Sequence, residues 1–336
     1  MADAPGENVK KFLGPAQVLV GLVVSALLVV LLVRAVDLRA LSEALNNADL
    51  RLVPIAVAPF FIGVWLRSVR WRLLLPGAAV TTRNLFRVQV IGFAINNLAP
   101  ARAGDLARAV LLSGHGVGYG TTAASLVVER LLDGLTLALI LLLALAFVPA
   151  PTYLVVLALI ATFGFLALFG VVGLALWRSD ALEAMAATVA RRLPQKIGAP
   201  LQRLAGGFAY GLTPLRHWHR IPVLLGLSVL GWGAQFVLFY VLMLAFAMPG
   251  ALGSAILAGA VGNFATLIPA SPAAVGTFDG AVVKVVMDSG GVSTEQAAAY
   301  ALVVHGTLFI PVIVMGIVML WRSRLSLGQI LSTRTA

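Results

Sequence analysis

Six long apolar runs constrain this chain more than any other feature. A helix needs about 20 apolar residues, rising 1.5 Å each, to cross roughly 30 Å of hydrocarbon. The chain is 60% hydrophobic and only 11% charged, so it lacks the polar groups that a water-facing surface needs. The sequence therefore predicts an all-α integral membrane protein that forms a single transmembrane domain over residues 1–336. The six predicted spans are residues 13–33, 52–75, 119–148, 153–177, 221–247 and 294–321.

The net charge of +11 does not indicate a nucleic-acid partner. The Lys and Arg residues lie in short gaps between apolar runs and do not form a basic stripe with interleaved aromatics. The absence of cysteine excludes thiolate metal sites and cysteine nucleophiles. His217 and His219 have no third ligand at metal-site spacing, and no hydrolase, metalloprotease or nucleotide-binding motif occurs. We therefore expect no catalytic residues, no metal and no cofactor.

Two further apolar stretches are too short to cross the bilayer. Asn84 to Pro100 continues into the charged segment Ala101–Leu112, and Leu252 to Pro269 is followed by Pro272–Met287. An arm of about 15 residues reaches only about 22 Å as a helix. The sequence therefore predicts two re-entrant helical hairpins with proline tips near mid-membrane. Their backbone must be buried in protein or line a cavity, because lipid cannot satisfy its polar groups.

The two halves of the chain have the same order of parts, namely a span, a hairpin and a span. Pro269 follows Pro100 by 169 residues, and the span at 221 follows the span at 52 by the same number. Three spans separate the hairpins, so the halves have opposite orientations. We therefore expect an inverted repeat with halves 52–148 and 221–321.

The loops predict the orientation of the protein. Basic residues dominate the 178–220 segment and the C-terminal tail, whereas the region around the second hairpin is acidic. Basic loops stay in the cytoplasm, so both termini are expected there, in a multi-pass protein of the cell (inner or plasma) membrane. The 178–220 segment is expected to be an amphipathic helix at the cytoplasmic surface.

The richest polar segment surrounds the first hairpin tip. Arg102, Asp105 and Arg108 are three residues apart and share a broad face of a helix that is expected to begin near Pro100, with Asn97 as its cap. A helix N-terminus beside an arginine suits an anion such as a phosphate head group. The alternative is a charged turn at the cytoplasmic interface that only stabilises the fold.

A second charged group lies inside the third predicted span. Glu129 and Asp133 are four residues apart and stack on one helical face, with Arg130 beside them. A lone carboxylate in the membrane would cost several kcal/mol, so partners are required. The candidates are Arg102, Arg108 and Arg130. The group either contacts substrate or forms an ion-pair lock between the hairpin and the span.

The second hairpin tip contains Ser271 and Pro272, which resemble an N-cap and a first helical residue. The new helix is expected to start there and to face the midplane, and Gly276 permits close backbone approach. A tightly packed turn without a ligand is the alternative.

Other polar groups have simpler explanations. Arg67, Arg70 and Arg72 end the second span, where arginines commonly extend to lipid phosphates. Gln235, Tyr300 and His305 are expected to form hydrogen bonds between helices.

Three segments together resemble one family, the lysylphosphatidylglycerol synthase transmembrane region, also called the flippase-like family. Residues Asn97 to Arg108 resemble its Asn–x–x–Pro–x–Arg–x–Gly–Asp/Glu–x–x–Arg signature, and Glu129 to Asp133 resemble its Glu–Arg–x–x–Asp motif. Residues 268–279 resemble a third family segment, with two departures. The family has a Gly pair where this chain has Ala273 and Ala274, and it has Glu at the last position where this chain has Asp279. The resemblance extends over about residues 13–325.

The resemblance implies movement of charged lipids, such as aminoacyl-phospholipids or polyprenyl-phosphate glycolipids, between leaflets. It implies no aminoacyl transfer, because bifunctional members carry that activity in a further cytosolic domain. Membrane lipids with phosphate head groups are thus the expected partners, and the sequence leaves open whether the chain forms a homo-oligomer. The alternatives are a non-catalytic partner of a synthase or glycosyltransferase, and an intramembrane enzyme with Glu129 or Asp133 as general base. The candidate substrate-binding residues are Asn97, Arg102, Asp105, Arg108, Glu129, Arg130, Asp133, Ser271, Gly276, Thr277 and Asp279.

Overall fold

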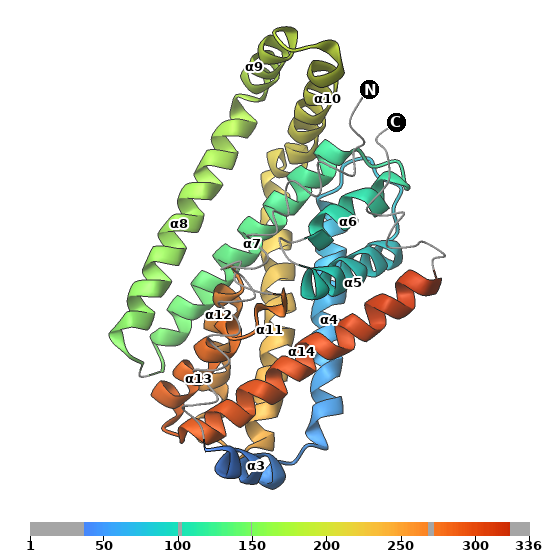
Figure 1. Ribbon diagram of the computed structural model, residues 1–336. Helices are drawn as coiled ribbons and strands as arrows, with labels where there is room; N and C mark the ends of the chain where they lie inside the picture. Colours follow the sequence, from blue (N-terminus) through green and yellow to red (C-terminus); the bar gives the residue numbers. More distant parts are fainter. Residues whose placement is uncertain (1–36, 100–102, 149, 268–271, 323–336) are drawn as a thin grey trace.

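The computed structural model describes residues 37–99, 103–148, 150–267 and 272–322, and within these ranges the secondary structure is helical with no strand (Figure 1). Short 3₁₀ turns, η1 (Thr213–Arg216), η2 (Trp218–Arg220) and η3 (Pro272–Ala274), join some of the α-helices. The α-helices are α3 (Leu38–Asn47), α4 (Leu52–Leu73), α5 (Thr82–Leu98), α6 (Ala103–Ser113), α7 (Tyr119–Leu145), α8 (Thr152–Trp177), α9 (Ser179–Arg191), α10 (Gln195–Leu212), α11 (Ile221–Ala245), α12 (Ala251–Ala265), α13 (Thr277–Gly290) and α14 (Thr294–Arg322).

Within the described residues, four helical stretches are long and apolar enough to cross a membrane, and they lie in α4, α8, η2 with α11, and α14. Each begins within three residues of a predicted span, so the chain is a multi-pass membrane protein. The predicted span 13–33 lies outside the described residues. Helix α7 has 27 residues, which is long enough, but every 18-residue stretch of it contains all three charges at Glu129, Arg130 and Asp133.

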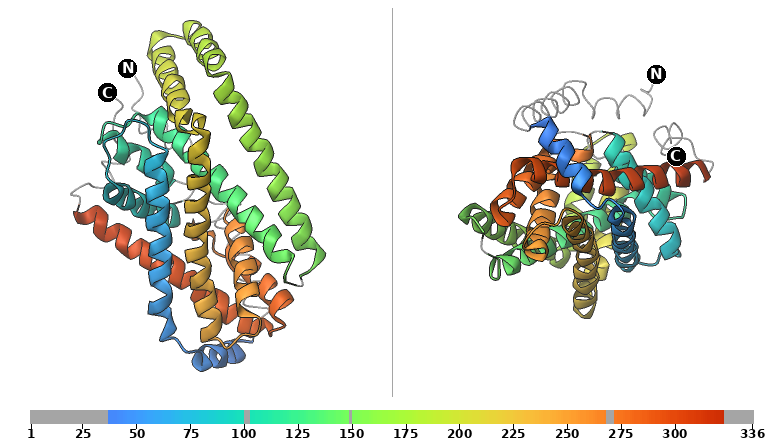
Figure 2. Two further views of the ribbon diagram at one scale, coloured as in Figure 1. Left: turned by 180° about the vertical axis from the view of Figure 1, so that it is seen from behind. Right: turned by 90° about the horizontal axis from the view of Figure 1, so that it is seen from below.

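Helices α4 and α11 form the central pair of the bundle. They lie side by side in opposite directions (Figures 1 and 2). Their closest approach is at two glycines, since a Cβ added to Gly63 would lie 2.7 Å from the carbonyl oxygen of Gly231. Glycine at this crossing allows the two backbones to touch, as small residues do at helix interfaces in membranes.

Two pairs of shorter helices, α5–α6 and α12–α13, pack around this centre in a matching way. Helix α5 lies against α14 and α6 against α7, while α12 lies against α7 and α13 against α14. Each short pair therefore bridges the same two long helices. The longest of the four, α5, has 17 residues and spans about 25 Å, which is less than the roughly 30 Å of a hydrocarbon core.

The prediction for the start of the second hairpin's second arm was wrong. Helix α13 begins at Thr277, five residues after Pro272, and η3 with two further residues precedes it. The cap is Gly276, whose N–H donates to the Asp279 carboxylate at 2.8 Å. The Asp279 carboxylate thus accepts the backbone N–H of Gly276, so α13 starts after this glycine and not at Pro272. Ser271 lies outside the described residues.

The 178–220 segment is helical, as expected, but it forms two α-helices and two 3₁₀ turns and not one amphipathic helix. Helix α10 packs against the first turns of α7, where Thr121 Oγ1 donates to the Gly207 carbonyl at 3.1 Å. Helix α3, in a loop that the sequence analysis left without structure, lies across the opposite end of the bundle (Figure 2). Its Leu41, Ala44 and Leu45 pack onto the core.

Helix α8 stands at one side of the bundle and contacts it mainly through α7 (Figure 1). Most of its large apolar side chains are exposed, including Ile160 and Phe163 at 67% each. In a membrane this surface faces lipid.

The first hairpin depends on a glycine contact, which gives a test of the fold. A Cβ at Gly104 would collide with the backbone carbonyl of Gly92 and lie 2.7 Å from the side-chain oxygen of Asn96. We expect Gly104→Ala to cost about 1–3 kcal/mol or more, because a backbone cannot move aside as a flexible side chain can. The matched control is Gly164→Ala in α8, where nothing lies within 4 Å. Thermal unfolding in detergent should separate the two variants, and equal midpoints would contradict the packing described here.

Candidate functional site

Seven charged side chains from three helices gather between the first hairpin and the central pair, and we call them the charge band. Two come from α4, two from α6 and three from α7. The sequence analysis singled out the five on α6 and α7 and treated the two on α4 as surface residues. The charge band consists of Arg67, Arg70, Asp105, Arg108, Glu129, Arg130 and Asp133.

The pair of Arg108 and Glu129 joins the first hairpin to α7. Arg108 is fully buried and donates from both terminal nitrogens to the Glu129 carboxylate, at 3.1 and 2.7 Å. Its guanidinium also lies over the Trp71 ring, 4.0 Å from the centroid. Such two-point pairs are the strongest arginine–carboxylate contacts. Glu129 thus has a partner among the predicted arginines, and the ion pair joins the hairpin to the span.

Asp133 has a different partner from those predicted. Arg70 Nη1 donates to Asp133 at 2.7 Å and to the Ser228 hydroxyl at 2.6 Å, and the Trp232 indole N–H donates to the same carboxylate oxygen at 3.1 Å. Asp133 therefore ties α4, α7 and α11 together. The interpretation of Arg70 as a residue that reaches lipid phosphates was wrong, because its side chain is fully buried.

Arg130 pairs with Asp105 at the more exposed edge of the band. Its Nη2 lies 3.1–3.2 Å from both carboxylate oxygens, and Arg108 lies 3.6 Å from Asp105 on the same face of α6, as the three-residue spacing predicts. Asn97 was the expected cap of this arm, but both it and Asn96 lie in the last turn of α5. Asn96 accepts the Gly104 N–H at 2.7 Å in place of Asn97, since the hairpin folds α6 back onto α5.

Arg67 extends the band toward the second hairpin. It donates to Gln235 of α11 at 2.8 Å, and Gln235 in turn donates to Asn263 near the end of α12 at 3.3 Å. The guanidinium lies 4.0 Å from the Trp232 ring centroid. The predicted hydrogen bonds of Gln235 are thus present, and a polar chain runs from the charge band to α12.

The chemistry of the charge band is that of anion binding. It holds four guanidinium groups and three carboxylates, and buried charges persist in a membrane only when they are paired or serve a ligand. Arg102, the other arginine assigned to a phosphate, lies outside the described residues.

A titratable pair joins the second hairpin to α14, with Asp279 on α13 and His305 on α14. Asp279 lies 2.8 Å from His305 Nδ1, and the imidazole stacks on Phe309 with centroids 4.2 Å apart. Thr277 donates to the Ala274 carbonyl at 3.0 Å. The predicted interhelical hydrogen bonds of His305 and Tyr300 are confirmed, the latter to the Phe239 carbonyl at 3.0 Å.

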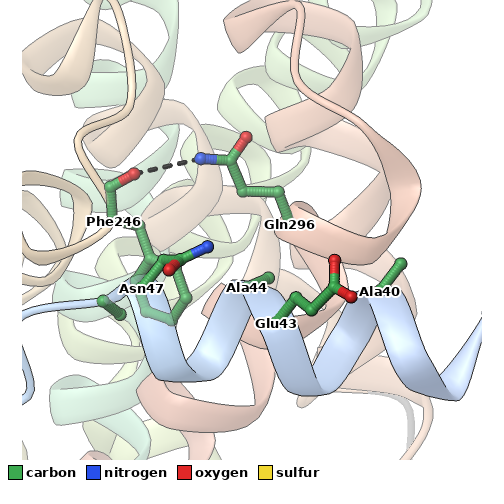
Figure 3. Close-up of a pocket in the computed structure, with 7 residues that line it drawn as sticks. Ala40, Glu43, Ala44, Asn47, Phe246 and Gln296 are labelled. Carbon is green, nitrogen blue, oxygen red and sulfur yellow. Dashed lines mark hydrogen bonds between the residues drawn. The ribbon is translucent and has the colours of Figure 1, made fainter.

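The described part of the chain holds no metal cluster, and the hollow found there lies away from the candidate residues. Among residues 37–322, gaps apart, no group of three His, Asp or Glu side chains is placed to hold a metal. A hollow of about 270 Å³ lies at the far end of the bundle beneath α3, lined by Glu43, Asn47, Phe246, Gln296 and three alanines (Figure 3). None of the predicted site residues lines it.

Arg67 and Arg70 are the main residues that sequence reasoning missed. They lie three residues apart on one face of α4, and both are buried, whereas Arg72 is exposed. The signal was available in the sequence, because Arg67 lies six residues, about 9 Å, inside the helix end, which is far for a side chain that must reach the interface.

The two alanines that replace the family's glycine pair give a stability test. Ala273 and Ala274 have φ of 54° and 55°, the left-handed region that glycine occupies without strain. We expect Ala273→Gly and Ala274→Gly each to stabilise the protein by about 1 kcal/mol. Ala281→Gly inside α13 is the control and should destabilise it by about 0.5–1 kcal/mol. Thermal midpoints that fall in all three variants would contradict this backbone geometry.

The buried pair of Arg70 and Asp133 gives a second test. Arg70→Met and Asp133→Leu each leave a buried charge unpaired, so each should cost about 3–5 kcal/mol of unfolding free energy. The double variant should cost clearly less than the sum, because it leaves neither charge behind. Lys284→Met removes the exposed Lys284–Asp288 pair and should change little. Unfolding in mixed micelles measures the cycle, and additive costs would show that the pair is not coupled.

Comparison with known proteins agrees with this description. The model of the lysylphosphatidylglycerol synthase transmembrane region matches residues 18–316, which is most of the chain. A search of the curated proteins found no match. The matched range contains α3 to α13 and most of α14, including every residue of the charge band. The chain therefore belongs to the lysylphosphatidylglycerol synthase transmembrane region family.

Proposed function

We propose that this protein is a lipid translocase that moves a lipid with a phosphate-bearing head group between the two leaflets. The observation that supports this most is the charge band, in which, among the described residues, three buried arginines stand against two buried carboxylates next to the two short helix pairs. A membrane protein gains nothing in stability from a surplus buried cation, so a functional role explains it better.

The arrangement of the helices supports the same proposal. We propose that α5–α6 and α12–α13 are re-entrant hairpins and that residues 52–148 and 221–321 are the halves of an inverted repeat. In support, the two short helix pairs make matching contacts with α7 of the first half and α14 of the second half. In addition, the first helices of the two halves, α4 and α11, run in opposite directions (Figure 1). Transporters commonly build substrate sites at the interface of such repeats from broken helices.

Phosphate binding by Arg108 would require a change in the charge band. In this structure both terminal nitrogens of Arg108 are occupied by Glu129. We propose that Glu129 and Asp133 neutralise arginines of the charge band until a lipid phosphate takes their place. A lipid phosphate that bound Arg108 would have to replace the Glu129 carboxylate.

The orientation proposed from the sequence places α9, α10 and both termini in the cytoplasm and α3 outside, in the cell membrane. The basic residues Arg191, Arg192, Lys196 and Arg203 lie in or beside α9 and α10, at the end of the bundle opposite α3 (Figure 1). Basic segments of this kind stay on the cytoplasmic side.

A reconstitution experiment tests the proposed function. In vesicles containing the protein and fluorescent phosphatidylglycerol, inner-leaflet label should become reducible by external dithionite faster than in protein-free vesicles. The double variant Arg70→Met/Asp133→Leu keeps the core apolar but removes two charges, so it should slow this exposure at least tenfold, whereas Lys284→Met should not.

The same vesicles distinguish the other functions. A chemically altered lipid, found by mass spectrometry, would indicate an intramembrane enzyme. Folded protein that leaves the lipid unaltered and in its original leaflet would contradict the translocase and favour a non-catalytic partner of a synthase or glycosyltransferase.

A further inference from the structure

Arg67 differs from the other three arginines of the charge band. Arg70, Arg108 and Arg130 each have a carboxylate oxygen within 4.0 Å, but Arg67 has none among the residues that the structure describes. Its side chain is nevertheless only 8% exposed. Its Nε is buried without a hydrogen-bond acceptor in the same described ranges, as are Nε of Arg108 and Nε and Nη2 of Arg70, so the missing carboxylate is what distinguishes Arg67. A buried cation in this state is costly unless an anion from outside the protein completes it.

The surroundings of Arg67 hold it in place without neutralising it. Gln235 accepts one N–H at 2.8 Å, and the Trp232 ring covers one face of the guanidinium at 4.0 Å. Gln235 is itself oriented by its 3.3 Å hydrogen bond to Asn263. All three of these neighbours are uncharged, and Asp133, which attracts Arg67 without contacting it, is already paired with Arg70 at 2.7 Å. The guanidinium of Arg67 therefore has no carboxylate of its own among the described residues.

The crossing of α4 and α11 explains why Arg67 does not turn away to the membrane surface. Gly63 and Gly231, at the point of closest approach, lie four residues before Arg67 and Gln235 respectively. Residues four apart lie on the same face of a helix. Gly231, which has no side chain, leaves room for the stem of Arg67, whose Cγ would lie only 3.4 Å from a Cβ there, and the Arg67 side chain passes this glycine to reach Gln235 on the same face of α11.

We propose that Arg67, oriented by Gln235 and Trp232 and flanked by Asn263, binds the phosphate group of the transported lipid. The inference rests on the proposed function and deepens it by naming a binding residue. The guanidinium offers a planar fork of N–H donors that matches phosphate oxygens. One uncompensated charge matches a singly charged phosphodiester. The amides of Gln235 and Asn263 add neutral hydrogen-bonding groups at the junction with the second hairpin.

Stability measured with and without lipid tests this assignment. The purified chain in non-ionic detergent is titrated with phosphatidylglycerol, diacylglycerol or inorganic phosphate while its thermal midpoint is recorded. Phosphatidylglycerol should raise the midpoint of the wild type, and diacylglycerol, which has no phosphate, should not. In Arg67→Gln the apparent affinity for phosphatidylglycerol should fall about tenfold or more, because hydrogen bonds to a charged group are among the stronger ones.

The lipid-free midpoint separates a binding role from a structural one. A binding cation without a carboxylate partner weakens the empty protein, so Arg67→Gln should be as stable as the wild type or more stable. A lower lipid-free midpoint together with an unchanged lipid response would overturn the proposal. Arg72→Gln, at the exposed end of the same helix, is the matched control and should keep both values.

Further variants and ligands keep the test decisive. If Arg67→Gln does not fold, Arg67→Met/Gln235→Leu removes both polar partners and should retain the fold while losing the lipid response. A response of the wild type to inorganic phosphate alone, abolished in Arg67→Gln, would support an anion site but overturn its assignment to a lipid.

Loss of phosphatidylglycerol binding in Arg67→Gln with no translocation by the wild type would support this site and reject the translocase. Translocation that survives in Arg67→Gln would reject Arg67 and leave the translocase standing.

Discussion

Within a membrane, a guanidinium must be compensated where it stands, and this requirement organises the centre of the protein. Arg108 is satisfied only when α6 lies against α7, and Arg70 only when α4, α7 and α11 meet around Asp133. Because the low dielectric makes an unpaired charge so unfavourable, these pairs specify which helices touch and in what register. The glycine contacts then let the backbones come close enough for the pairs to form.

The sequence predicted the long helices well because their signal is local. Apolar length alone placed the starts of the helices at Leu52, Tyr119, Ile221 and Thr294, each at the predicted residue. Helix ends at the hairpin tips were predicted less well. There, single side chains decide the boundary, as Asp279 does for α13 and Asn96 does for α6. Such hydrogen bonds depend on how the arms fold together, which periodicity does not reveal.

The site was predicted in part for the same reason. Pairing within the hairpin and its neighbouring span, as for Arg108 with Glu129, follows from motifs that are close in the sequence. Pairing across 63 residues, as for Arg70 with Asp133, does not. Arg67 and Arg70 were therefore judged by their position near a helix end, where exposure is the usual outcome. The depth of Arg67 in the helix argued for burial, but the partners on α7 and α11 were not predictable from it.

The exposed position of α8 has a consequence for the membrane around the protein. Its apolar stretch, Thr152–Leu174, is 23 residues long, or about 35 Å, and thus exceeds a hydrocarbon core of roughly 30 Å. Such hydrophobic mismatch is relieved by tilting the helix or by thickening the bilayer locally. Helix α8 is packed mainly against α7, which carries three residues of the charge band, and the Phe165 ring of α8 lies against Gly134, next to Asp133. A change in the tilt of α8 therefore reaches α7 first, so we expect bilayer thickness to act on the charge band through this pair of helices.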